Sequence, residues 1–264
     1  MSLGVAIKGP EGMVLAADSR VTVEAKQGSA SPMIVSFDNA TKLLSFFAPN
    51  RHIGVVTYGA ALIGLRTAYS YVSEFELTLP ENQRLEVTDF AYRLSNFFME
   101  RWIEVTPKEY SGPSMSFITC GYDSDYAYGK TFLFDIPKHP VPQPRNPGER
   151  EFGMTWGGQL QVASRLIHGY DPVVTEVIRR ELNLDQQKTS ELMTHIRQRT
   201  EFQIPYEMLP LQDCIDLAVF LIQTTISAQK LAIGVRGVGG TIEVATITRT
   251  EGLQYVQKKP LHVE

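Results

Sequence analysis

The chain has 264 residues, 43% of them hydrophobic, and carries a formal net charge of −4. This length suits one large domain with a sizeable buried core, and an acidic balance without any basic block excludes a typical nucleic-acid binder. No apolar run approaches the roughly 20 residues that span a bilayer, and no secretory leader pattern opens the chain, so we expect a cytoplasmic protein with no membrane partner.

The first half of the chain is typical of two strand pairs followed by two helices. The turn Gly9-Pro10-Glu11-Gly12 joins the first two strands as a hairpin. The stretch 24–39 is polar and is expected to form a loop. A second strand pair follows, and apolar residues at helical spacing then predict two helices. The expected bounds are strands at 3–8, 13–18, 42–47 and 53–58, and helices at 60–75 and 87–105.

The second half contains strands, more helices and closing strands. The stretch 137–147 holds five prolines, so we expect a surface loop there. The Gly-rich run 234–240 precedes a strand rather than a helix, which argues against a phosphate-binding loop. Expected strands lie at 114–121, 130–135, 151–156, 241–248 and 253–257, and helices at 159–168, 172–182, 185–200 and 211–230. This segregation indicates an α+β fold of stacked antiparallel sheets with helices outside them, in a single domain over residues 1–264.

The cysteines and histidines do not form a recognisable metal-binding pattern. Cys120 ends an apolar strand and Cys214 lies in an apolar helix, where buried thiols behave as small hydrophobes. No Cys/His spacing typical of zinc is present, and His52 and His195 stand alone. We therefore predict neither a metal nor a cofactor.

Ser2 is the candidate nucleophile. If Met1 is removed, as is usual before a small residue, Ser2 carries both a hydroxyl and a free α-amine. An α-amine titrates at about pH 8, so it can act as the base that activates its own side chain. On this residue alone, an ordinary exposed terminal serine is the simpler interpretation, because most proteins that start with Met-Ser have just that.

Three further residues could assist such a nucleophile. Asp18 stands at the end of a strand, and Lys42 opens an apolar strand where an ammonium needs a carboxylate partner. A lysine near a positive terminus has a lowered pKa and can help to move a proton. Gly59 occupies a strand-to-helix turn, where a backbone N–H could face an oxyanion. A charged strand end, a lysine that reaches to water and an ordinary tight turn are the simpler alternatives.

Three blocks of the sequence resemble the proteasome β-subunits, which are N-terminal nucleophile hydrolases. The run 12–22 is similar to that family's Gly-Val-Val-Leu-Ala-Ala-Asp-x-Arg-x-Thr, and Ser2 falls without a gap where the family has its N-terminal Thr. Thr41-Lys42-Leu43-Leu44 with the turn at 58–61 resembles the family's lysine strand and glycine turn, and 239–249 resembles its closing strand. By this resemblance the chain looks like an outlying bacterial or archaeal 20S proteasome-type subunit.

The resemblance implies a four-layer αββα sandwich and a threonine-type peptidase with Ser in place of Thr. Ser2 would be the nucleophile with its α-amine as base, Asp18 would orient Lys42, Lys42 would tune the nucleophile's proton, and the Gly59 N–H would stabilise the oxyanion. The implied partners are a peptide or unfolded-protein substrate, further copies of the chain in stacked rings, and an unfoldase whose identity the sequence leaves unknown. The implied substrate-binding residues are Arg20, Val21, Thr22, Ala40, Thr57 and Ala61.

The sequence departs from the family pattern where the terminal amine should be oriented. The family's Gly-Ser-Gly serine is absent near Trp156, with Thr155 or Gly157 nearest, and 235–238 lacks the carboxylate that usually precedes the closing strand. Two alternatives therefore stay open. One is acyl transfer or ligation to an incoming amine, and the other is a non-catalytic, ring-forming subunit with a decayed site.

Overall fold

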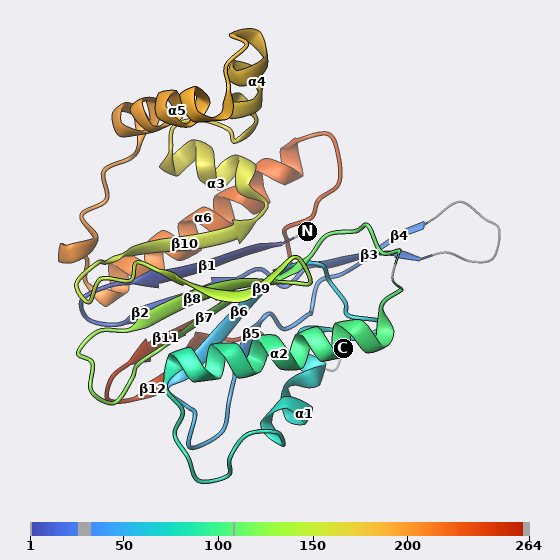
Figure 1. Ribbon diagram of the computed structural model, residues 1–264, viewed down its shortest axis with the longest axis vertical. Helices are drawn as coiled ribbons and strands as arrows, with labels where there is room; N and C mark the ends of the chain where they lie inside the picture. The colour runs from blue at the N-terminus through green and yellow to red at the C-terminus, as the bar shows by residue number, and fades with distance from the viewer. Residues whose placement is uncertain (1, 26–32, 108, 261–264) are drawn as a thin grey trace.

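The computed structural model describes residues 2–25, 33–107 and 109–260. Within these residues the strands form two five-stranded antiparallel sheets and one separate two-stranded hairpin, and helices lie outside the sheets (Figure 1). The prediction of a mixed α/β fold with antiparallel sheets is confirmed.

The first sheet contains the strand that begins the chain. Its order is β10-β1-β2-β11-β12, and β1 and β2 are buried along their whole length. The predicted hairpin between them is closed by the Gly9 N–H, which donates to the Gly12 carbonyl at 2.9 Å. The strands of this sheet are β1 (Leu3–Lys8), β2 (Met13–Ala17), β10 (Gly153–Gly158), β11 (Glu243–Thr248) and β12 (Gly252–Gln257).

The second sheet has the order β5-β6-β7-β8-β9, and its last strand corrects an expectation. The proline-rich stretch forms the edge strand β9 rather than a loop. Pro140, Pro142 and Pro144 alternate along it, so their missing N–H groups all lie on the same edge and remove no bond to β8. The strands of this sheet are β5 (Leu43–Ser45), β6 (Ile53–Gly59), β7 (Met115–Gly121), β8 (Lys130–Ile136) and β9 (His139–Arg145).

A two-stranded hairpin replaces part of the loop expected at 24–39. β3 (Val21–Ala25) pairs with β4 (Met33–Phe37), in register from Val21 opposite Phe37 to Ala25 opposite Met33. The β-branched residues of these strands favour extended backbone. The hairpin leaves the body of the molecule at the end of the first sheet where the chain begins (Figure 1). Residues 26–32 of the expected loop lie outside the described residues.

Helices cover the two sheets from opposite sides. α2 (Val87–Val105) packs on β7, β8 and β9, and α6 (Leu211–Leu231) packs on β1 and β2. The helix expected at 60–75 starts late, because Gly64 has a φ of +61° and Ile63 pairs with Arg66 in a turn. Only the 3-10 turn η1 (Ala68–Tyr71) and α1 (Val72–Glu76) form there; the remaining helices are α3 (Leu160–Ile167), α4 (Val173–Glu181), α5 (Gln186–Thr200) and the 3-10 turn η2 (Tyr206–Met208).

One described helix, α6, is long and apolar enough to cross a membrane by length and composition alone, although the sequence reading expected no such segment. Its contacts give a simpler account of its composition. Cys214, Ala218, Leu221, Ile222 and Ile226 are buried in a cluster with β1, β2 and α3.

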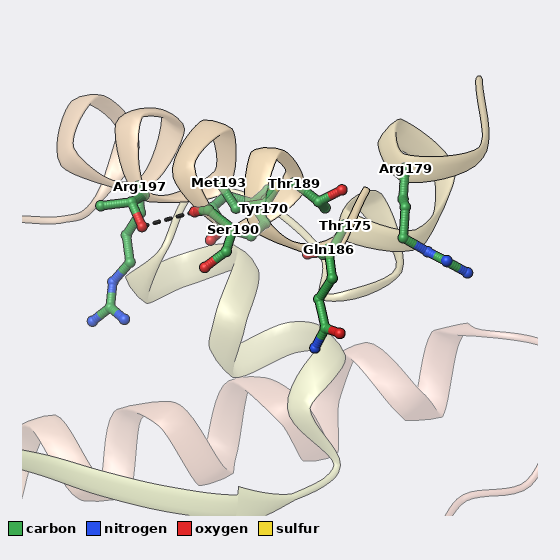
Figure 2. Close-up of a pocket in the computed structure, with 9 residues that line it drawn as sticks. Tyr170, Thr175, Arg179, Gln186, Thr189, Ser190, Met193 and Arg197 are labelled. Atoms are coloured by element: carbon green, nitrogen blue, oxygen red, sulfur yellow. Dashed lines mark hydrogen bonds between the residues drawn. The ribbon is translucent and has the colours of Figure 1, made fainter. Parts of the chain in front are cut away.

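The pair α4 and α5 lies outermost on the side of α3 and α6 (Figure 1). α5 begins at an N-cap, because the Asp185 carboxylate accepts the Lys188 N–H at 2.8 Å. α4 buries none of its residues, whereas α5 buries Thr189 and Met193. An open cavity of about 570 Å³ lies between the two helices, lined by hydroxyl and arginine side chains (Figure 2).

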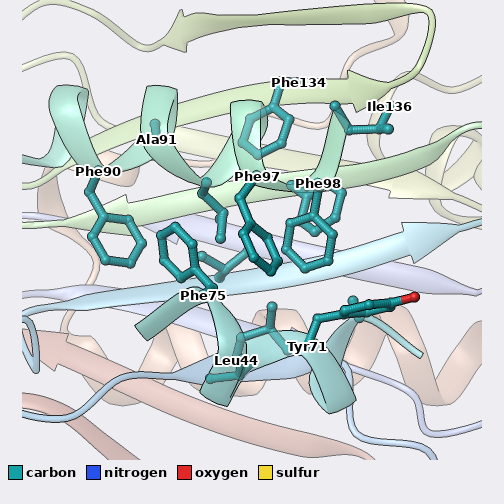
Figure 3. Packing of buried hydrophobic residues seen from close by; sticks show 14 of the residues in the cluster. Leu44, Tyr71, Phe75, Phe90, Ala91, Phe97, Phe98, Phe134 and Ile136 are labelled. Carbon is teal, nitrogen blue, oxygen red and sulfur yellow. The ribbon is translucent and has the colours of Figure 1, made fainter. Parts of the chain in front are cut away.

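The core consists of three layers of apolar contacts. An aromatic layer that includes Phe97, Phe98 and Phe134 lies between α2 and the second sheet (Figure 3). Within it Phe117 stacks on Phe134 with 4.9 Å between ring centroids. A second layer lies between the first sheet and α6. The third lies where β1 and β2 face β6, and includes Leu15, Leu43 and Val56. Each fully buried side chain of this size stabilises the fold by about 1.5–3 kcal/mol.

Candidate functional site

Ser2 lies immediately before β1, at the end of the layer between the two sheets. Its side chain and backbone together are 5% exposed. The Ser2 carbonyl accepts the Gln159 N–H at 2.7 Å, and Gly158 is so close that an added Cβ would lie 1.9 Å from that carbonyl oxygen. The start of the described chain is therefore held against the end of β10.

Asp18 holds the segments around the site together through its hydrogen bonds. It is 1% exposed and directly follows β2. Its Oδ1 accepts the Leu3 N–H at 3.0 Å and the Lys42 ammonium at 2.8 Å. Its Oδ2 accepts the Arg20 N–H at 3.1 Å and the Gly239 N–H at 3.0 Å. A single buried carboxylate thus joins four segments of the chain, and each oxygen has two donors.

Lys42 is held as the sequence predicts, on the carboxylate of Asp18. Its ammonium also donates to the Arg20 carbonyl at 2.6 Å, and its side chain is 5% exposed. Burial lowers the pKa of Lys42 below its ordinary value, while the charge and hydrogen bond of Asp18 oppose that shift. This ammonium can therefore give up a proton more easily than a lysine in water.

A small cavity brings Ser2 and Lys42 together. Its volume is about 20 Å³, which is room for one water molecule rather than a side chain. A bound peptide must therefore lie across the mouth of this cavity unless the walls move. The cavity is lined by Ser2, Val21, Ala40, Thr41, Lys42, Thr57, Tyr58, Ala60, Ala61, Thr67, Ala68 and Met115. Among the predicted substrate-binding residues, Val21, Ala40, Thr57 and Ala61 are in its wall.

Gly59 ends β6, and the expected helix does not follow it. Its φ of +88° and an added Cβ only 2.3 Å from the Ser114 carbonyl explain why glycine is needed. The Ala60 N–H donates to Ser114 on the β7 side, whereas the Thr57 N–H donates to Lys42 on the β5 side. Because N–H groups alternate along a strand, the Gly59 N–H points to the Lys42 side.

Arg20 and Thr22 are not brought into the cavity. The Arg20 guanidinium binds both carboxylate oxygens of Asp38, at 2.6 and 2.7 Å, and its hydrogen bonds lower the pKa of Asp38. The Thr22 hydroxyl lies 3.2 Å from that of Ser36 on the β3–β4 hairpin. Arg20 nevertheless serves the site through its backbone, since its carbonyl holds Lys42.

Two elements of the site were missed by the sequence reading. Gly239, in the Gly-rich run, donates its N–H to Asp18, and an added Cβ there would lie 2.6 Å from the Arg20 guanidinium. Gly158 and Gln159, rather than Thr155 or Gly157, are next to Ser2, because Gly158 is opposite Leu3 in the β1–β10 register. The double glycine at the end of β10 was the available signal for this close approach.

The cavity between α4 and α5 is larger but lacks this chemistry. The lining of the cavity between α4 and α5 includes Ser and Thr hydroxyls but no carboxylate, lysine, histidine or thiol that could act as a base (Figure 2). Among the described residues, no group of three or more His, Cys, Asp or Glu side chains could hold a metal ion. Nucleophile and proton-handling groups meet in the Ser2 cavity.

No protein-family model matches the chain, and no curated protein matches it. Among solved structures, the chain is similar to the helical assembly of the Anbu complex from Pseudomonas aeruginosa, with a TM-score of 0.57 and 16% sequence identity. The likeness covers 98% of this chain and 88% of that one. At this identity the likeness concerns the fold.

This comparison corrects one prediction. The identification of the chain with the proteasome β-subunits, as an outlying 20S proteasome-type subunit, is wrong: no family model supports it, and the structure to which the chain is similar is the Anbu complex.

Proposed function

We propose that this chain is a terminal-nucleophile peptidase in which the Ser2 hydroxyl attacks an amide carbonyl once residue 1 has been removed. One observation carries the proposal: Ser2 and Lys42 line the same small cavity, and Lys42 is fixed there by Asp18 and the Arg20 carbonyl. A nucleophile, a lysine with a lowered pKa and an orienting carboxylate are the parts that such chemistry requires.

In the proposed reaction the freed α-amine of Ser2 takes the hydroxyl proton as Oγ bonds to the carbonyl carbon. Lys42, whose pKa is lowered by burial, helps to move this proton from Oγ to the amine. The Gly59 N–H donates to the carbonyl oxygen as it becomes an oxyanion. The protonated amine then gives its proton to the leaving nitrogen as the C–N bond breaks. Water, deprotonated by the same amine, hydrolyses the acyl-enzyme.

We also propose how the chain is organised around this site. The packing of α2, the two sheets and α6 supports a four-layer αββα sandwich. The similar solved structure is a helical assembly, which supports a homo-oligomer built from repeated copies of this chain. An extended peptide or unfolded segment would lie across the mouth of the cavity, beside Val21. A cytoplasmic location fits two free, buried thiols.

Intact mass and one covalent probe test the proposal. The mass of the purified protein should show that Met1 has been removed. A peptide epoxyketone, which needs both a hydroxyl and a free amine, should then add once per chain at Ser2. Ser2→Thr should keep the adduct and Ser2→Ala should lose it. Ser36→Ala, which alters an exposed serine on β4, should react like the parent protein.

Two outcomes would overturn the proposal. Retained Met1 would block the amine and remove the base. Absence of an adduct on chains that begin at Ser2 would leave the fold as a non-catalytic subunit. If the adduct forms, hydrolysis and transfer are separated by supplying a peptide together with a competing amine and comparing the two products.

A further inference from the structure

A second buried ion pair lies at the same end of the inter-sheet layer as Lys42. Glu243 on β11 and Lys259, just after β12, approach to 3.8 Å, with side chains 1% and 8% exposed. The Glu243 Oε1 and the Lys259 Nζ have no hydrogen-bond partner among the described residues. The cost of removing two charges from water exceeds their mutual attraction when hydrogen bonds do not support them. The Glu243–Lys259 pair is therefore poorly explained as a stabilising contact.

The strand register places Glu243 beside the proposed site. Glu243 is opposite Ala17, the residue before Asp18, in the β2–β11 ladder. Side chains two apart on a strand share a face, and Ala245, two positions on, belongs to the inter-sheet cluster that also contains Leu43. Glu243 therefore points into the layer where Lys42 lies.

The end of β12 is fixed to the same place by two hydrogen bonds. The Tyr255 hydroxyl donates to the Leu43 carbonyl at 3.1 Å, and the Gln257 side chain donates to the Ile242 carbonyl at 2.7 Å. These bonds tie β12 to the residues next to Lys42 and next to Glu243. Lys259 follows two residues later, and its positive charge contributes to the lowered pKa of Lys42.

We propose that Lys259 is a positioning residue of the site, which favours loss of a proton from Lys42 through charge repulsion while Glu243 holds it in place. The inference rests on the proposed function, and it makes Lys259 part of the site. In this proposal Asp18 orients Lys42 through its hydrogen bond, and Lys259, which is paired with Glu243, sets how readily Lys42 gives up its proton.

The charged groups around Lys42 determine the expected sign. Asp18 favours its protonated form, whereas Arg20 and Lys259 disfavour it; Arg20 is itself paired with Asp38. The freed amine of Ser2 adds a further positive charge. Removing Lys259 deletes one repulsion and leaves Glu243 uncompensated, so both changes should move the titration of Lys42 to higher pH. A shift of roughly half to one pH unit is expected.

The test follows Lys42 directly by NMR of lysine-labelled protein, with Lys42→Arg used to assign its side-chain signal. Lys259→Met should move the Lys42 titration upward, and Lys259→Arg should leave it near the parent value. The double variant Glu243→Gln/Lys259→Met, which removes both charges, should give a smaller upward shift of the Lys42 titration. It keeps the test valid if Lys259→Met alone fails to fold. Lys258→Met is the matched control: it removes the same charge from an exposed neighbour, and its effect should be less than about 0.2 unit.

The pH dependence of epoxyketone addition to Ser2 is measured on the same variants, and its profile should move in the same direction as the Lys42 signal. An unchanged Lys42 titration in both Lys259→Met and the double variant would overturn the inference. A shifted titration in a parent protein that never forms the Ser2 adduct would support the charge effect and refute the proposed function, so the two failures are distinguishable.

Discussion

The hydrogen bonds of the buried Asp18 carboxylate lead to a specific prediction, because its two oxygens accept the same number of them. Each accepts two donors, and three of the four are backbone N–H groups. In Asp18→Asn one oxygen becomes an NH₂ group, and in either orientation that group faces two donors. Two buried hydrogen bonds are lost and the Lys42 ammonium loses its counter-charge. We expect the free energy of unfolding to fall by about 3–5 kcal/mol.

Lys42→Met should behave differently at the same ion pair. It removes one donor, but the Asp18 carboxylate keeps three backbone N–H groups, so its charge stays hydrogen-bonded. We expect a loss of about 1–2 kcal/mol. For a chain of this size the two variants should lower the melting temperature by about 10 °C and about 4 °C respectively. Both should lose the reaction with epoxyketone.

Thermal unfolding is compared at one protein concentration, after size-exclusion chromatography has shown the same oligomeric state, because association raises apparent stability. Two results would contradict this prediction: Lys42→Met lowers the melting temperature as much as Asp18→Asn, or Asp18→Asn melts at the same temperature as the parent protein. Either result would mean that the backbone donors do not hold the carboxylate as described.

Three further outcomes follow from the structure. Gly59→Ala should lower the free energy of unfolding in urea by about 2 kcal/mol or more, because the φ of +88° and the nearby Ser114 carbonyl exclude a Cβ at this position. An unchanged urea midpoint would argue against this backbone geometry. Because the pKa of Lys42 is lowered in the folded protein, the unfolded chain binds more protons between that lowered pKa and about 10.5. The parent protein should therefore gain stability relative to Lys42→Met as the pH rises through this range. A stability difference that does not change with pH would contradict the lowered pKa. Burial raises the pKa of Cys120 to about 12 and that of Cys214 to about 11. Neither thiol should therefore react with a disulfide reagent at about pH 8 until denaturant is added. Rapid reaction of the native protein would show that one of the thiols is exposed.

Local patterns in the sequence were sufficient for the parts of the fold that depend on nearest neighbours. The turn at Gly9 and the apolar runs on each side define the first hairpin, and helical spacing places α2 and α6 within a residue or so. The same patterns failed for β9, because prolines alone cannot reveal that a strand lies at a sheet edge. They failed also at 60–67, where Gly64 and a short turn delay the helix.

The sequence by itself determined the chemistry available near the start of the chain: a serine behind Met1, a carboxylate at the end of β2 and a lysine that needs a partner. Their pairing followed from burial, since an ammonium in an apolar strand must find a carboxylate. Only the tertiary structure decided that Arg20 turns to Asp38, and that the fourth donor to Asp18 is Gly239, 221 residues away. Such contacts join residues that are close only after the two sheets have packed, so no local pattern can encode them.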